Sequence, residues 1–239
     1  MSEYAYAPAR KWAAWAVHLL TATGAVAGLM ALLATSHHKW VHAFGFMGVT
    51  LFIDSVDGAL ARLCNVKVVL PQFDGELLDN IVDYFCYVIV PAFFLYECGL
   101  VPYGYGIVAA IGITLASGYQ FCQTDAKTDD HFFKGFPSYW NVVVFYLFML
   151  GFPPWVNLVI LLALAVAVFI PVRYLYPSRT RVLRPLTVTL SAVWGVLLVS
   201  VLWRYPDHNP VWLHASLLYV GYYFVVSGYL TLRRASAVA

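Results

Sequence analysis

The sequence has 239 residues, of which 62% are hydrophobic and 11% are charged, and its formal net charge is +2. A soluble domain of this size cannot bury so much apolar surface in one core, so the composition excludes a soluble globular protein and indicates an integral membrane protein. We expect no nucleic-acid partner. The four cysteines have neither metal-site spacing nor an extracellular framework, so we expect them to be reduced.

Apolar runs long enough to cross a hydrocarbon core of about 30 Å follow one another along the chain. In chain order they cover residues 12–34, 41–62, 77–98, 103–122, 139–151, 155–176, 184–203 and 211–231. The fifth run is short, so seven spans are the alternative to eight. The sequence therefore predicts an all-α fold, a polytopic bundle of about eight transmembrane helices.

The basic residues favour an even number of spans. If the N-terminus is cytoplasmic, only Lys39 and Arg204 fall outside. The other basic residues all fall inside: Arg10, Lys11, Arg62, Lys67, Lys127, Lys134, Arg173, Arg179, Arg181, Arg184, Arg233 and Arg234. By the positive-inside rule this asymmetry predicts that both termini are cytoplasmic.

The connections between the runs leave no room for an extracellular domain, and there is no internal repeat. We therefore expect residues 1–239 to form a single integral membrane domain. The longest inner connection, residues 123–138, is polar at first and aromatic at its end. Loops of this kind often determine specificity. His18 lies alone in the first apolar run, and the sequence gives it no role.

Carboxylates interrupt the membrane pattern in two places. In "DSVDGALAR", Asp54, Asp57, Gly58, Ala61 and Arg62 share one face of a helix. In "GELLDNIVDY" the same is true of Gly75, Asp79 and Asp83. A short cytoplasmic loop joins the two runs, so we expect antiparallel neighbouring helices that bring all four carboxylates to a similar depth.

Four neighbouring carboxylates in a medium of low dielectric constant need protons or cations to neutralise them. Oxygen ligands without His or Cys select Mg²⁺, Mn²⁺ or Ca²⁺ over zinc. Ions held this way can clamp a diphosphate, which suggests transfer of a phosphoryl-type group. Solvated interfacial charges are one alternative. A cation transporter is another, disfavoured because the carboxylates lie at the cytoplasmic end of the spans and not at mid-depth.

The residues resemble the CDP-alcohol phosphotransferase family, whose motif is D-x2-D-G-x2-A-R-x8-G-x3-D-x3-D. The motif region here is 54–83, and every motif residue matches in type. The spacer "LCNVKVVLPQFD" has twelve residues instead of eight, which adds either about one helical turn or a longer loop around Pro71. This spacer resembles that of the bacterial phosphatidylcholine synthases, a branch of the family. The segment "FKGFPS", residues 133–138, is similar to one in phosphatidylserine synthases.

The resemblance implies an enzyme that transfers the phosphatidyl group of CDP-diacylglycerol to an alcohol and releases CMP. Two ions, Mn²⁺ or Mg²⁺, would be held by Asp54, Asp57, Asp79 and Asp83, and Asp83 would also be the general base. The CDP-diacylglycerol site would comprise Asp57, Gly58, Ala61, Arg62 and Gly75. The resemblance also suggests a homodimer in the bacterial inner membrane.

The acceptor alcohol would be choline, with serine or another small alcohol as the alternative. A quaternary ammonium is best held by aromatic faces, at about 0.5–2 kcal/mol for each good contact. The aromatic candidates near the cytoplasmic side are Tyr84, Tyr87, Tyr119, Phe133, Tyr139 and Trp140. Asp125 or Glu76 would supply the counter-charge, although packing is the commoner role for any single aromatic residue.

Overall fold

The computed structural model describes residues 7–207 and 209–238, with side chains as far as Arg233. The side chain of Arg234, counted above among the inner basic residues, lies outside the described residues. The chain forms two compact units, Met1–Val90 and Pro91–Ala239.

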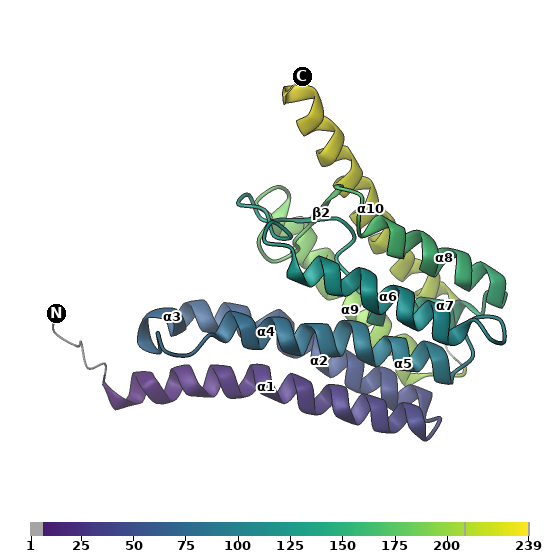
Figure 1. Cartoon of the computed structure of the whole chain (residues 1–239), viewed down its shortest axis with the longest axis horizontal. Coiled ribbons are helices and arrows are strands. Elements are labelled where there is room, and N and C mark those ends of the chain that lie inside the picture. Colours follow the sequence, from purple (N-terminus) through teal and green to yellow (C-terminus); the bar gives the residue numbers. More distant parts are fainter. Residues whose placement is uncertain (1–6, 208, 239) are drawn as a thin grey trace. The chain divides into compact units, whose positions relative to one another are not determined.

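The first unit contains the two motif segments. Its elements in chain order are α1 (Pro8–Ser36), α2 (Trp40–Leu63), α3 (Val66–Val69), α4 (Gly75–Tyr84) and the π-helical turn η1 (Phe85–Ile89), drawn from purple to blue in Figure 1. Helix α1 packs along α2 and also contacts α3, α4 and η1. It therefore touches both of the helices that carry the motif.

Two glycines of α1 allow this close packing. A Cβ atom at Gly24 would lie 2.9 Å from the side chain of Val82, and one at Gly28 would lie 2.8 Å from the ring of Phe85. Their spacing is that of a GxxxG motif, in which small residues let two membrane helices approach closely. The thiol of Cys86 donates a hydrogen bond of 3.3 Å to the carbonyl of Gly24.

The third predicted span is helical from Gly75 to Glu97, as expected, but it is not regular. After α4 the chain makes the π-helical turn η1 and continues as α5 (Val90–Glu97). The local reason is Pro91, which has no N–H to donate to the carbonyl of residue 87 and whose ring crowds that carbonyl. Turns of this kind are frequent at functional sites.

The second unit contains α6 (Gly106–Cys122), α7 (Trp140–Leu150), α8 (Pro154–Ala167), α9 (Arg184–Trp203) and α10 (Pro210–Val238). Hydrogen bonds between hydroxyl groups join α9 to α10, with 2.8 Å between Thr187 and Tyr222 and 2.7 Å between Ser191 and Tyr219. Such bonds help to hold membrane helices together.

A short antiparallel sheet in this unit was not predicted. Strand β1 (Phe132–Lys134) pairs with β2 (Arg173–Leu175), so that Phe133 lies opposite Tyr174. Residues 168–176, which we expected to be helical, therefore lie outside α8. Pro171 explains the difference, because a proline disfavours helical geometry at the residue before it and cannot donate a helix hydrogen bond.

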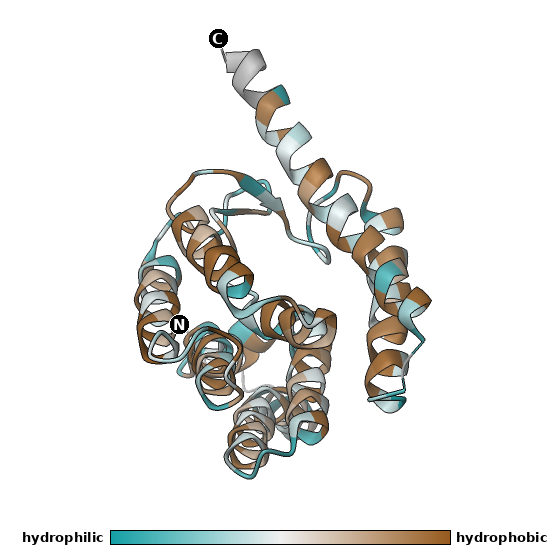
Figure 2. Cartoon of the chain, turned by 90° about the vertical axis from the view of Figure 1, so that its right-hand side faces the viewer, coloured by the Kyte–Doolittle hydropathy of each residue, from teal (hydrophilic) through white to brown (hydrophobic). Residues whose placement is uncertain are grey.

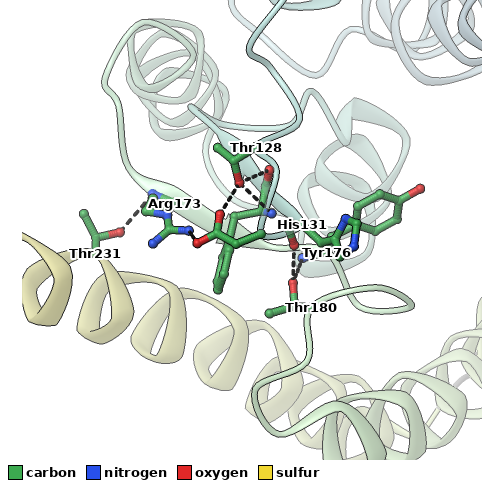
Figure 3. Close-up of polar contacts among 8 residues, drawn as sticks. Thr128, His131, Arg173, Tyr176, Thr180 and Thr231 are labelled. Atoms are coloured by element: carbon green, nitrogen blue, oxygen red, sulfur yellow. Dashed lines mark hydrogen bonds and ion pairs between the residues drawn. The ribbon is translucent and has the colours of Figure 1, made fainter.

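Polar contacts fasten this sheet to its surroundings (Figure 3). The Thr180 hydroxyl donates to the carbonyl of His131 at 2.6 Å and accepts from the backbone N–H of Tyr176 at 2.8 Å. The backbone N–H of Arg173 donates to the hydroxyl of Thr231 in α10 at 2.9 Å. The guanidinium of Arg173 pairs with Asp130. The residues of the long inner connection are therefore held in place by β2, the turn after it and α10.

The helices confirm a polytopic membrane protein. Among the described residues, five helices are long and apolar enough to cross a membrane: Pro8–Ser36, Trp40–Leu63, Gly75–Glu97, Arg184–Trp203 and Pro210–Arg233. The other three predicted spans correspond to the shorter apolar helices α6, α7 and α8. In Figure 2 apolar residues predominate along the helices, and hydrophilic residues gather in the connections.

Candidate active site

The two motif helices form as the sequence predicts. Asp54, Asp57, Gly58, Ala61 and Arg62 all lie in the last turns of α2. Gly75, Asp79 and Asp83 all lie in α4. The spacer between them takes the helical alternative, since it contains the one-turn helix α3. Val66, Val69 and Leu70 of this spacer are buried in a cluster with Ala14 and Val17 of α1.

Three of the four carboxylates converge. One oxygen from each of Asp54, Asp57 and Asp79 lies within 4.8 Å of the other two. Asp83 lines the same small cavity, together with Thr21, Gly24, Cys86 and Tyr87. Asp57 is the most enclosed of the four and is only 5% exposed.

The donor set fits a hard divalent cation. Two ligands on opposite sides of Mg²⁺ are about 4.2 Å apart, and on Ca²⁺ about 4.6–5.2 Å, so oxygens within 4.8 Å can share one ion with at most a small side-chain shift. The thiol of Cys86 already donates to a backbone carbonyl. A buried carboxylate such as Asp57, whose hydrogen-bond donor is a neutral hydroxyl, is also a group that a cation would stabilise.

Two hydroxyl groups hold two of these carboxylates. The Thr21 hydroxyl of α1 donates to Oδ2 of Asp57 at 2.7 Å. The phenol of Tyr87, in η1, donates to Oδ2 of Asp54 at 2.9 Å. Both donors are buried, at 7% and 4% exposure. A donor fixed on one carboxylate oxygen restricts the direction in which the other oxygen points.

The start of α4 is set by a cap and by a close contact. The Asp74 carboxylate accepts hydrogen bonds from the backbone N–H groups of Glu76 and Leu77, at 3.1 and 2.9 Å. A Cβ atom at Gly75 would lie 2.3 Å from Cε1 of His18. We expected Gly75 to make room for the substrate, but the imidazole of α1 occupies the space beside it.

The remaining motif residues differ in their surroundings. A Cβ atom placed at Gly58 would meet Nη1 of Arg62 at 3.4 Å. Arg62 itself is exposed. Ala61 instead packs against the buried cluster formed by α1 and the spacer. Gly58 and Arg62 therefore keep an accessible face for a ligand, whereas the small size of Ala61 serves helix packing.

Three acceptor-site candidates lie in the first unit. Tyr84, the last residue of α4, is half-buried. Tyr87 is the hydroxyl donor to Asp54, which is a different role from the aromatic wall that we expected. The carboxylate of Glu76 is paired with Lys67 at 2.7 Å, so it is not an isolated counter-charge for choline.

The other candidates for the acceptor site lie in the second unit. The indole of Trp140 is fully buried and donates to the hydroxyl of Ser117 at 2.7 Å, which argues against a contact with choline. Tyr139 is half-buried, and its ring lies edge-on to Phe133 with 6.1 Å between the centroids. Tyr119 is 51% exposed and lies beside Phe169.

Asp125 also has a basic partner. Its carboxylate accepts a hydrogen bond from Lys134, and this bond lowers the pKa of Asp125 and raises the pKa of Lys134. Both side chains are substantially exposed. The expected role of Asp125 as a counter-charge for an ammonium group is weakened, because Lys134 already supplies one positive charge.

The comparison with known sequences agrees with this geometry. Residues 14–170 match the sequence model of the CDP-alcohol phosphatidyltransferase family, and the matched range contains most of α1 and both motif helices. The chain belongs to the CDP-alcohol phosphatidyltransferase family. The match begins within α1, the helix that supplies Thr21 and His18.

Several curated relatives in this family carry the name phosphatidylcholine synthase. The chain is 49% identical to one from Legionella pneumophila over 227 residues, which are 92% of this chain and 89% of the relative. It is 44% identical to one from Legionella bozemanae, covering 85% of this chain and 97% of the relative. It is 38% identical to one from Pseudomonas aeruginosa, and this match covers 90% of this chain and 92% of the relative.

The motif did not reveal that Thr21 and His18 of α1 would contact the motif helices, nor that Tyr87 would donate to Asp54. Only the GxxxG spacing of Gly24 and Gly28 indicated that α1 would pack closely on another helix. Thr21 lies one turn before Gly24 on the same helix and had no signal of its own, because a threonine in a membrane helix usually bonds to its own backbone.

Proposed function

We propose that this protein is a phosphatidylcholine synthase, which transfers the phosphatidyl group of CDP-diacylglycerol to choline and releases CMP. The observation that carries the proposal is the convergence of Asp54, Asp57 and Asp79 on one cavity in a membrane protein of this family. The name shared by relatives that are 38–49% identical over most of the chain favours choline over serine or another small alcohol.

In this proposal Asp54, Asp57 and Asp79 hold divalent metal, Mn²⁺ or Mg²⁺, and Asp83 completes a site for two ions. Bound metal would neutralise the diphosphate and stabilise the charge that develops on the leaving CMP. The carboxylates keep the diphosphate at the end of α2. There the exposed guanidinium of Arg62 and the open face at Gly58 meet the CDP moiety.

Asp83 is the proposed general base. It lies one turn after Asp79 in α4 and lines the same cavity. It takes the proton of the choline hydroxyl as that oxygen forms its bond to the lipid-side phosphorus. The bond between this phosphorus and the CMP oxygen then breaks, so CMP leaves with the electron pair.

For the acceptor we retain the half-buried or exposed aromatic candidates Tyr84, Tyr119 and Tyr139. A ring that is accessible on one face can contact a quaternary ammonium, whereas a fully buried ring such as that of Trp140 cannot do so without a rearrangement.

The proposal also includes location and assembly. The similarity to bacterial relatives supports a protein of the bacterial inner membrane, and the positive-inside asymmetry supports cytoplasmic termini. We further propose that the two compact units act as one catalytic domain, since the family match continues across Val90 to residue 170. The family resemblance suggests a homodimer.

The test uses the purified full chain in detergent with CDP-diacylglycerol, Mn²⁺ and a panel of labelled alcohols. We expect phosphatidylcholine and CMP in equal amounts with choline, and loss of both when a chelator removes the metal. Preferential use of serine or another alcohol would overturn the choline assignment. Absence of CMP with every alcohol would overturn the enzyme assignment.

Asp57→Asn and Asp79→Asn are the decisive variants, because each removes a charge from the converging set while keeping the size of the side chain. Both should fold and lose more than about 100-fold in CMP release, the lower end of the range for a lost electrostatic contact in an active site. Asp129→Asn, at an exposed site in the second unit, is the matched control and should retain full activity.

A further inference from the structure

Two residues outside the family motif contact the proposed metal ligands directly. Thr21 comes from α1 and Tyr87 from the π-helical turn, and they approach different carboxylates of the same cavity. Both donate to Oδ2, on Asp57 and on Asp54 respectively. Each carboxylate therefore has one oxygen fixed by a buried neutral donor.

The Thr21 bond is more than the usual local contact of a helical threonine. Its hydroxyl lies 3.4 Å from the carbonyl of Val17, one turn earlier, but only 2.7 Å from the Asp57 carboxylate. The shorter distance, and the charge on the acceptor, make the contact with Asp57 the dominant one.

The position of Tyr87 depends on the π-helical turn. Residue 87 lies within η1, one turn after Asp83, and its phenol reaches across to α2. A small residue on α1 makes this packing possible, because the helix surface at Gly28 accommodates Phe85 and Cys86 of the same turn. The turn therefore places a second hydroxyl donor on the cavity, on a different carboxylate from the one that Thr21 contacts.

We infer that Thr21 and Tyr87 are positioning residues that orient the Asp57 and Asp54 carboxylates toward a shared divalent cation. The inference rests on the proposed function, since it assumes that this cavity binds metal. Hydrogen-bond donors that fix a ligating carboxylate typically change metal affinity 10- to 100-fold when they are removed. Both residues act through the ligands and need not touch the substrate.

The test removes each hydroxyl with little change in shape, by Thr21→Val and Tyr87→Phe in the full chain. Mn²⁺ binding is measured without substrate, by the paramagnetic resonance signal of free Mn²⁺. The Kd for Mn²⁺ should rise about 10-fold or more in each variant. In the enzymatic assay the Mn²⁺ concentration for half-maximal rate should rise in step, while the rate at saturating Mn²⁺ changes less.

Thr21→Ser is the conservative variant, which keeps the hydroxyl and should restore affinity. Thr23→Val is the matched control, because the Thr23 hydroxyl is exposed and bonds to the Leu20 carbonyl on its own helix. Tyr96→Phe, at a half-exposed ring, is the control for Tyr87. Both controls should bind Mn²⁺ as the unaltered protein does.

Asp57→Asn separates failure of this inference from failure of the proposed function. If Asp57→Asn abolishes Mn²⁺ binding while Thr21→Val and Tyr87→Phe bind normally, the metal site stands and the positioning role is wrong. If the unaltered protein and Asp57→Asn bind Mn²⁺ equally, the cavity is not the metal site, and both ideas fail.

Discussion

The imidazole of His18 occupies the space beside Gly75, with Cε1 only 2.3 Å from where a Cβ atom at position 75 would lie. The ring also lies tilted against that of Phe73, with 4.4 Å between the centroids, and His18 is only 6% exposed. Helix α4 therefore begins against α1, and that contact requires a glycine at its first position.

Gly75→Ala should lower stability by about 1–3 kcal/mol, because the new methyl group overlaps the His18 ring. His18→Ala in the same chain should recover part of that loss, since it opens the space that the methyl group needs. The measurement is the thermal unfolding midpoint of both single variants and the double variant. Strictly additive effects would show that the two residues do not meet.

Gly58→Ala should behave differently. A methyl group at this position meets Arg62 at an ordinary contact distance, so folding should be unchanged within about 0.5 kcal/mol. If the CDP moiety lies against this face, the KM for CDP-diacylglycerol should rise by about 10-fold or more. Unchanged kinetics in this variant would place the nucleotide elsewhere.

Leu70→Ala tests whether the long spacer is a folded part of the unit. Leu70 is 1% exposed and is buried with Val66 and Val69 against α1. Truncating it should cost about 2–5 kcal/mol, the range for a buried leucine. Val68→Ala, at an exposed site on the same short helix, is the control and should have little effect on the unfolding midpoint.

The exposed pair of Asp125 and Lys134 gives a dependence on pH. The hydrogen bond from Lys134 lowers the pKa of Asp125, so the pair contributes stability above the unfolded carboxyl pKa of about 3.9 and loses it as the pH falls through the lower folded value. Asp125→Asn should therefore lower the unfolding midpoint slightly near neutral pH, and the difference should vanish in strong acid.

The same variant tests the acceptor site, because Asp125 was a candidate counter-charge for choline. Since Lys134 already pairs with the carboxylate, the KM for choline should stay within about two-fold of that of the unaltered protein. A ten-fold increase would return Asp125 to the choline site.

The sequence predicts the helices and the two motif faces well, because helical spacing and a polar interruption in an apolar run are local signals. Asp54 and Asp57 share a face by spacing alone, and the structure confirms it. The sequence could not show that Asp79 joins them more closely than Asp83, because that depends on how α4 is rotated against α1 and α2.

Other features depend on tertiary packing and had no local signal. The burial of Trp140 and the pairing of β1 with β2 each require partners more than 20 residues away. The end of α8 before Pro171 had a local signal, but the apolar run continued through it and hid the break. Glycines in a motif are also ambiguous, since a Cβ atom at Gly58 would meet Arg62 at an ordinary contact distance, whereas one at Gly75 would overlap the His18 ring.

Among the residues that the structure describes, those that line the cavity of the four carboxylates all lie between Thr21 and Tyr87. Translation proceeds from the N-terminus, so every residue of that cavity is synthesised before α6 begins. The membrane insertion machinery thus receives α1 and the two acidic helices before the second unit, so the carboxylates can meet α1 and each other while the nascent chain is still growing.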